Sequence, residues 1–218
     1  MFSVVKLDLL IAIYVFCVVI AEVMGGKTFH ILDIGSYPLN ASVALFVVPA
    51  IFSINDIVTE VYGPERMRSI IRSTLLVVVL VLLFSLLATN LPPSKRFVIN
   101  EGAYDTIFGL TARISAASLT AFAVADFLDV LFFSKIRKRL GKKALWFRNN
   151  ASNFISQFID STVFIFLAFY AFDKGLGDNI GFLFSLIIPY WLLKTFMSVV
   201  ETPFVYLGVN WLKDEKKA

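Results

Sequence analysis

The sequence has few of the residues from which most enzyme and metal sites are built. Its 218 residues include one cysteine, Cys17, and one histidine, His30, which lie apart from each other. A single cysteine excludes an intramolecular disulfide, and a lone Cys and a lone His make neither a metal cluster nor a nucleophile–base pair. Phosphate-binding glycine loops and the HExxH and GxSxG motifs are also missing. We therefore expect a protein that is not an enzyme and holds no metal or other cofactor.

Charged residues are also scarce. They make up 17% of the chain, against about 25% in soluble domains, while 58% of the residues are hydrophobic and the mean hydropathy is +0.81. The apolar residues form long blocks, not alternating or 3.6-residue stripes, which indicates helices that face lipid. We expect an all-α integral membrane protein, with residues 1–218 forming one transmembrane domain. The net charge of +4 is concentrated in short loops, so we expect no nucleic-acid partner.

Six segments are long enough to cross a bilayer, since a spanning helix needs roughly 20 residues. Pro49 interrupts the second, and the last is long enough to tilt. Loops are expected at 25–40, 92–110 and 135–148. The spans are expected at Lys6–Met24, 39–61, 70–91, 111–134, 150–172 and 181–211. In each set of three spans, the middle helix contains many of the polar residues. This distribution is compatible with two three-helix halves of inverted topology.

The basic residues are distributed unequally between the two sides that six spans define. One side has 14 Lys and Arg residues, seven of them within 135–148, and the other side has 4. Because basic loops remain in the cytoplasm, both termini are expected to be cytoplasmic.

The span 150–172 has an unusual polar stripe. Asn153, Gln157 and Asp160 share one arc at 100° per residue, and Asp160 lies about 15 Å along the helix from its start, near the membrane midplane. Counted from the opposite face, Lys194 reaches a similar depth. A carboxylate within a membrane indicates a functional site, and an Asp160–Lys194 pair would neutralise both charges. The alternatives are a purely structural ion pair or packing seam, and a Lys194 that reaches the interface alone.

Two further carboxylates, Asp56 and Glu60, lie four residues apart on the second span. Like charges at this spacing repel unless a proton or a cation lies between them. The alternative is that these groups reach water and pair with Arg66 or Arg68. Asp129 in the fourth span is likewise either a functional carboxylate or a group that pairs with basic residues of the loop at 135–148.

Several of these residues fall within segments that resemble a known family. The stretch SINDIVTEVYG at 53–63, followed by basic residues, is similar to the signature of the queuosine precursor transporter family, also called the vitamin uptake transporter family. The segment 123–169 resembles the same family, and Lys194 followed by Glu201-Thr-Pro203 resembles its last helix. Glu22 departs from the pattern, which has Asn there. Within 123–169 the matching hallmarks are Asp129, Trp146, Arg148, Ser152, Gln157, Asp160 and Ser161.

The resemblance implies an importer of queuosine precursors (7-cyano-7-deazaguanine, its aminomethyl form or queuine) in the cell membrane, for salvage into tRNA modification. We expect secondary transport, with the substrate in a midplane cavity between the second, fifth and sixth spans. Carboxylates would accept from the ring's donor edge, and Lys or amide groups would donate to its carbonyl. Asp129, Trp146 and Arg148 are expected to act in gating or structure. The expected substrate-binding residues are Asn153, Gln157, Asp160, Lys194, Glu201, Asp56, Glu60 and Asn55.

Other functions remain open from the sequence. The chain could be a substrate-capture subunit energised by a separate ATPase, or a carrier for another small heterocycle. A membrane enzyme or a structural membrane protein is also open. The expected partners are a deazaguanine and the lipid bilayer, and a homo-oligomer is not excluded. Accumulation by the purified chain alone, driven by a proton gradient, would exclude the ATPase-dependent alternative.

Overall fold

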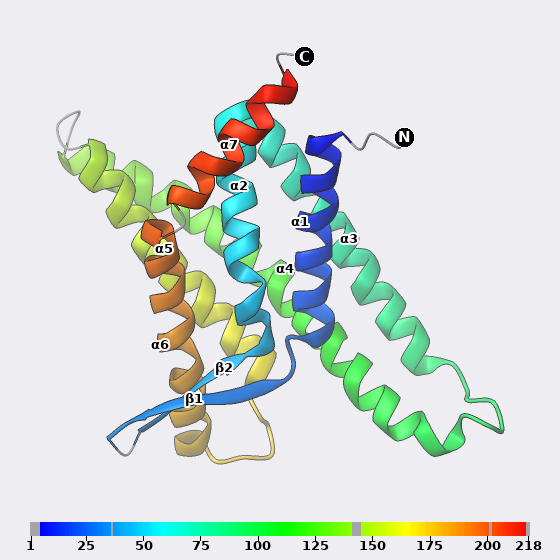
Figure 1. The fold of residues 1–218 in the computed structure, drawn as a ribbon. Helices are drawn as coiled ribbons and strands as arrows, with labels where there is room; N and C mark the ends of the chain where they lie inside the picture. Colours follow the sequence, from blue (N-terminus) through cyan, green and yellow to red (C-terminus); the bar gives the residue numbers. More distant parts are fainter. Residues whose placement is uncertain (1–4, 36, 141–144, 201, 217–218) are drawn as a thin grey trace. The chain divides into compact units, whose positions relative to one another are not determined.

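The computed structural model describes residues 5–35, 37–140, 145–200 and 202–216, without the side chains of 126–153, 155–156, 197–202, 204 and 214–216. The described chain is mostly helical, with one two-stranded sheet (Figure 1). The elements are α1 (Lys6–Met24), β1 (Thr28–Ile34), β2 (Tyr37–Ser42), the 3-10 turn η1 (Val43–Phe46), α2 (Val48–Tyr62), α3 (Pro64–Asn90), α4 (Val98–Leu140), α5 (Leu145–Phe169), α6 (Leu176–Val200) and α7 (Thr202–Lys216).

The chain forms two compact units. Unit 1 consists of Met1–Phe29, Ser42–Ser115 and Phe196–Ala218, and unit 2 of His30–Ala41 and Ala116–Thr195. Unit 1 therefore contains α1, α2, α3, α7 and the beginning of α4. Unit 2 contains the rest of α4 with α5 and nearly all of α6.

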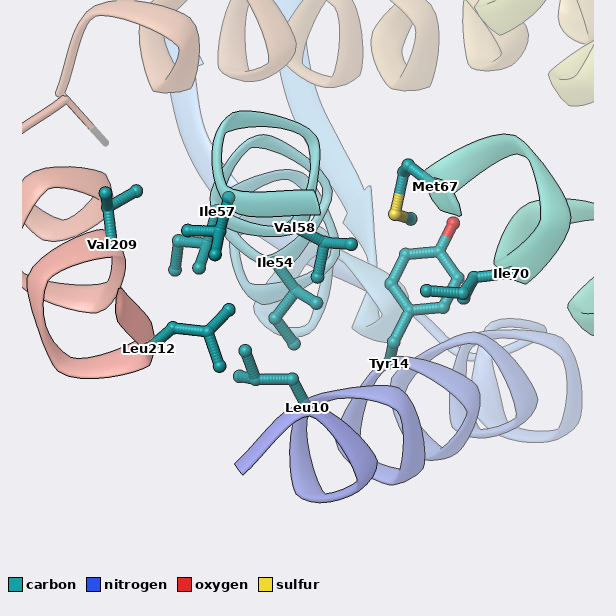
Figure 2. Packing of buried hydrophobic residues seen from close by; sticks show 10 residues of the cluster. Leu10, Tyr14, Ile54, Ile57, Val58, Met67, Ile70, Val209 and Leu212 are labelled. Atoms are coloured by element: carbon teal, nitrogen blue, oxygen red, sulfur yellow. The ribbon is translucent and has the colours of Figure 1, made fainter. Parts of the chain in front are cut away.

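The core of unit 1 is built around α2. Figure 2 shows α2 between α7 and α3, with α1 alongside and Ile57 directed toward α7. Apolar side chains from all four helices bury one another and exclude water from the contact. The fully or nearly fully buried members of this cluster are Leu10, Tyr14, Ile54, Ile57, Val58, Val61, Met67, Ile70, Val209 and Leu212. Removing any large member would leave a cavity, so this cluster fixes α7 against α2.

Glycine and proline set the connection between α2 and α3. Gly63 ends α2 with a φ of 86° and donates its N–H to Thr59 O at 2.9 Å. Pro64 then begins α3, because a proline at the first helical position needs no hydrogen-bond donor. Helix α3 therefore starts six residues before the expected residue 70.

The second expected span is shorter than the sequence suggested. Pro49 lies in the first turn of α2 and does not interrupt the helix, because the first N–H groups of a helix have no intrahelical partner. The chain before it forms η1, whose first turn is capped by the Ser42 hydroxyl accepting from Ala44 N at 3.1 Å. Together η1 and α2 form the apolar segment Val43–Tyr62.

The expected loop at 25–40 is wrong, because most of it forms the hairpin of β1 and β2. Gly35, with a φ of 65°, lies in its turn. The base of the hairpin is closed by Val43 N donating to Lys27 O at 2.9 Å and by the Ser42 hydroxyl donating to Gly25 O at 2.6 Å.

Two other boundaries are also corrected. Most of the expected loop at 92–110 is helical, since α4 begins at Val98 and has 43 residues. At 1.5 Å per residue it is about 64 Å long, twice the hydrocarbon thickness. The expected last span, 181–211, divides into α6 and α7. The expected loop at 135–148 is also largely helical, apart from residues outside the description.

In unit 2, α5 and α6 are joined by a short turn that Asn179 holds in place. This side chain is 2% exposed. Its Oδ1 accepts from Ala171 N at 2.8 Å, and its Nδ2 donates to Ala171 O at 2.8 Å and to Lys174 O at 3.1 Å. Behind the turn, the two helices share a buried cluster of Ile165, Leu183, Leu186 and Ile187.

Among the described residues, five helical segments are long and apolar enough to cross a membrane. A shorter apolar segment, Gln157–Phe169, belongs to α5, whose earlier side chains fall outside the description. Each of the five segments overlaps one of the expected spans, and the number of six spans stays a prediction. The five segments are Lys6–Met24, Val43–Tyr62, Pro64–Asn90, Val98–Ala125 and Leu176–Phe196.

Candidate functional site

A charge pair joins α5 to α6 within unit 2. Lys194 Nζ donates to Asp160 Oδ2 at 2.7 Å, and the Lys194 side chain is 11% exposed while that of Asp160 is 30% exposed. Such a contact has the length of a charge-assisted hydrogen bond. Both residues belong to apolar helices, where an unpaired charge would be costly. The pairing predicted from their depths is confirmed.

One aromatic ring contacts the lysine end of this pair, and three more pack together on the same two helices. Lys194 Nζ lies 5.3 Å from the centroid of the Tyr190 ring, within cation–π range. Trp191 packs against Phe154 with a centroid distance of 4.6 Å and against Phe158 at 5.3 Å. All of these rings come from α5 and α6, the two helices that also carry the charge pair.

Two polar atoms in this region are buried without a hydrogen-bond partner among the described residues. They are Nε1 of Trp191 and Oγ of Ser161, whose side chain is fully buried. Gln157 lies one turn before Asp160 and is half-buried. Buried polar groups are ordinarily paired, so the indole N–H of Trp191, three residues before Lys194 in α6, can donate to a ligand that offers an acceptor.

Helix α6 contains a proline in its interior, Pro189, five residues before Lys194. Pro189 has no N–H and cannot donate to the carbonyl of Ser185, four residues earlier. Ser185 also receives a hydrogen bond from Asn40 of β2, from Nδ2 to Oγ at 2.8 Å, and the Tyr37 hydroxyl donates to Gly181 O at 2.8 Å. The hairpin residues of unit 2 therefore fasten the first half of α6.

A separate polar groove lies within unit 1, between α2 and α7. It has a volume of about 480 Å³ and contains Asp56, Thr59 and Glu60 on α2. Asn55 lies beside it, with Thr59 Oγ1 donating to Asn55 Oδ1 at 3.4 Å. Arg68, a suggested partner for these carboxylates, forms an ion pair with Glu65. The opposite wall of the groove comes from α7, which the sequence did not indicate.

The remaining predicted residues cannot be placed as side chains. Asp129 lies in α4, and Trp146, Arg148 and Asn153 lie in α5, but their side chains are outside the described part, as is Glu201 altogether. Asp160 and Lys194 are together in unit 2, and Asp56 and Glu60 are together in unit 1. The predicted cavity that combines both sets stays a prediction.

These features define a polytopic membrane protein with polar groups inside its apolar helices. Residues 42–208 match the family model described as "Putative vitamin uptake transporter". The chain belongs to this transporter family, as the motif resemblance indicated.

Two curated relatives carry the same description, "Probable queuosine precursor transporter". The protein from Bacillus subtilis (strain 168) is 29% identical over 210 residues, covering 93% of this chain and 84% of the relative. The protein from Haemophilus influenzae (strain ATCC 51907 / DSM 11121 / KW20 / Rd) is 31% identical over 153 residues, covering 64% of this chain and 60% of the relative. No solved structure matches the chain.

Proposed function

We propose that this chain is a secondary transporter that imports a queuosine precursor across the cell membrane, as one transmembrane domain with both termini in the cytoplasm. The description of the two relatives supports the substrate class. The single observation that carries the proposal is the 2.7 Å contact between Asp160 and Lys194 on two apolar helices. A deazaguanine has a donor edge and a carbonyl acceptor, which are the two functions that this pair can serve once it opens.

The proposed exchange keeps every charge paired. In the unliganded state Asp160 and Lys194 neutralise each other. When the precursor binds, the Asp160 carboxylate accepts from the N–H and NH₂ edge, and the Lys194 ammonium donates to the ring carbonyl. Because each group gains a partner as it loses the other, opening the pair leaves no bare charge in an apolar environment.

Neighbouring residues supply the other recognition elements. Trp191, with Phe154 and Phe158, offers aromatic surface on which a planar heterocycle stacks. Gln157, Asn153 and Glu201 contribute further donors and acceptors to the ring edge. Asp56 and Glu60 act on the cytoplasmic side as a gate or proton relay, and Asn55 contributes to substrate binding. Binding drives transport only if the substrate favours one conformation over another, and the opened charge pair provides this difference.

The test is uptake of a labelled precursor into cells that cannot make one. Asp160→Ala and Lys194→Ala should each reduce initial uptake at least about tenfold, because each leaves the other charge without its partner and removes one ligand contact. Asp173→Ala and Lys174→Ala are the matched controls, since these charges are exposed in the α5–α6 connection of the same unit. They should transport at the wild-type rate.

Membrane expression of every variant must be measured alongside uptake. If Asp160→Ala and Lys194→Ala are present at normal levels and transport at the intact rate, the charge pair is not the substrate site. If wild-type cells take up no precursor above cells lacking the chain, the proposed substrate class is wrong.

A further inference from the structure

We propose that an apolar groove between α3 and α4 binds the acyl chains of an anionic phospholipid, whose phosphate is held by Lys95 and Arg96. The groove has a volume of about 690 Å³, within the roughly 300–1,000 Å³ of small-molecule sites. Its lining residues all belong to unit 1. It is therefore separate from the charge pair of Asp160 and Lys194, and it shares no lining residue with the α2–α7 groove.

The lining of this groove suits hydrocarbon. Among the described residues none that lines it is charged, and the only polar side chains are those of Ser85 on α3 and Tyr104 on α4. The α3 wall is a stripe of large apolar side chains that recur at intervals of three and four residues, as the exposed face of one helix does. These side chains are Leu80, Leu83, Phe84 and Leu87, which are 54–70% exposed.

The length of the groove corresponds to one leaflet of a bilayer. Along α3 it extends from Val77 to Ala88, which is about 16 Å at 1.5 Å per residue. The hydrocarbon core is roughly 30 Å thick, so this length is the depth that the chains of one lipid occupy. Val77 lies at the middle of α3, and the helix ends at Asn90, two residues beyond Ala88. The groove therefore runs from the middle of the helix to its end.

Contacts beside the groove hold α4 against the end of α1. Thr111 Oγ1 donates to the carbonyl of Val23, a lining residue, at 3.3 Å. Gly26 lies close to Leu110, since a Cβ at residue 26 would be 2.4 Å from Leu110 Cδ2. A ligand that enters between walls already in place requires little reorganisation of the protein.

Two adjacent basic residues lie in the connection that follows this end of α3. Lys95 and Arg96 are exposed, and neither forms an ion pair with another residue in the described part of the chain. The next residue, Phe97, contacts the lining residue Tyr104, with a centroid distance of 5.4 Å. The basic pair is thus next to a ring that packs on the groove.

The carboxylates that follow in the chain do not replace a lipid phosphate. Glu101 and Asp105 are partly buried, and Oδ1 of Asp105 is buried without a hydrogen-bond partner among the described residues. Lys95 and Arg96 have long, exposed side chains that can turn toward the membrane surface. Basic residues next to a spanning helix attract anionic lipids, and both side chains donate to phosphate oxygens. The groove alone would accept any acyl chain, so the basic pair is what selects the head group.

The experiment is native mass spectrometry of the purified full chain in detergent, titrated with phosphatidylglycerol or with phosphatidylcholine carrying the same acyl chains. We expect phosphatidylglycerol to bind on the order of tenfold more tightly. Lys95→Gln and Arg96→Gln should each lower this ratio several-fold, and the double variant should bring it close to one. Lys174→Gln is the matched control, because this exposed lysine lies in a connection of unit 2. It should leave the ratio unchanged.

A variant that fills the groove tests the acyl-chain contact separately. Ala88→Phe adds a ring to the lining, so it should weaken both lipids by a similar factor and preserve their ratio. If the folded Ala88→Phe protein binds both lipids as tightly as the wild type, the chains bind elsewhere and the proposal is wrong. The exposed Lys95 and Arg96 variants decide the question if Ala88→Phe does not fold.

Three further results would overturn the lipid site. They are equal affinity of the wild type for the two lipids, an unchanged ratio in the double variant, and a mass of two chains without lipid. The last result would mean that a second copy of the chain covers the groove. Uptake of precursor by cells is a separate measurement, so the lipid site and the proposed function can fail independently.

Discussion

The indole N–H of Trp191 has no hydrogen-bond partner within the described part of the chain, although its ring packs against Phe154 and Phe158. An unpaired buried donor destabilises a fold by about 1–3 kcal/mol. The proposed substrate presents a ring carbonyl and, in one form, a nitrile, and either would accept this hydrogen bond. The same atom can therefore be unfavourable in the empty protein and favourable in the complex.

Trp191→Phe separates these two effects. The Phe ring keeps an aromatic contact but lacks the N–H, so we expect the unfolding temperature of the purified empty protein to stay equal or to rise slightly. The KM for precursor uptake should rise several-fold because one hydrogen bond to the substrate is lost. Trp211→Phe is the control: its ring lies 4.9 Å from Lys6 Nζ in unit 1, and its KM should not change. An unchanged KM for Trp191→Phe would remove the indole from the site.

At the residue scale, the sequence predicts which charged residues pair but not which aromatic rings contribute to the site. Asp160 and Lys194 could be paired in advance, because charges are rare in apolar helices and their distances from the helix ends can be counted. The chain has 23 Phe residues, and lipid-facing and packing positions favour the same rings. Only the structure distinguishes Phe154 and Phe158, which pack against Trp191, from the other Phe residues.

The contact between α2 and α7 depends on the missing side chain of Gly208. A Cβ at this position would lie 2.3 Å from Ile57 Cδ1. We expect Gly208→Ala to destabilise the protein by about 1–3 kcal/mol, because the α2–α7 core would have to move apart. Ile57→Val removes Cδ1, so the double variant should be more stable than the sum of the two single changes by at least about 0.5 kcal/mol.

Chemical denaturation of the purified protein measures these differences. Gly109→Ala is the control, because a Cβ at this position in α4 would meet nothing within 4 Å. In an open helical position alanine is favoured over glycine by about 1 kcal/mol, so this change should stabilise. A stabilising effect of Gly208→Ala as well would show that α7 does not pack against α2 at this point.

The elements that sequence could predict are those set by long apolar runs. Helix α1 has the expected bounds, Lys6–Met24, because both of its ends coincide with the ends of an apolar block. The hairpin of β1 and β2 was missed, since it lies in a short segment without clear alternation between polar and apolar residues. The beginning of α4 was missed because residues 98–110 mix charged and apolar side chains. The groove was missed because its α7 wall was read as part of one long span.

At the scale of the whole chain, basic residues are distributed unevenly along the sequence. The connections at β1–β2, between α3 and α4, and between α5 and α6 contain only Lys27, Lys95, Arg96 and Lys174, whereas 14 basic residues lie at the alternate positions. Basic segments are retained in the cytoplasm during insertion. We therefore expect both termini in the cytoplasm and the three sparsely charged connections outside.

Single-cysteine labelling in a Cys17→Ser background tests this orientation. Ser94→Cys, between α3 and α4, and Gly175→Cys, between α5 and α6, should react with a membrane-impermeant maleimide in intact cells. Glu65→Cys at the start of α3 and Lys213→Cys in α7 should react only after the membrane is permeabilised. All four positions are exposed in the structure, so a failure to react reports the side of the membrane and not burial. The opposite pattern at all four would place the basic segments outside. It would also place the α2–α7 groove on the outer side of the membrane. The proposed cytoplasmic role of Asp56 and Glu60 would then be wrong.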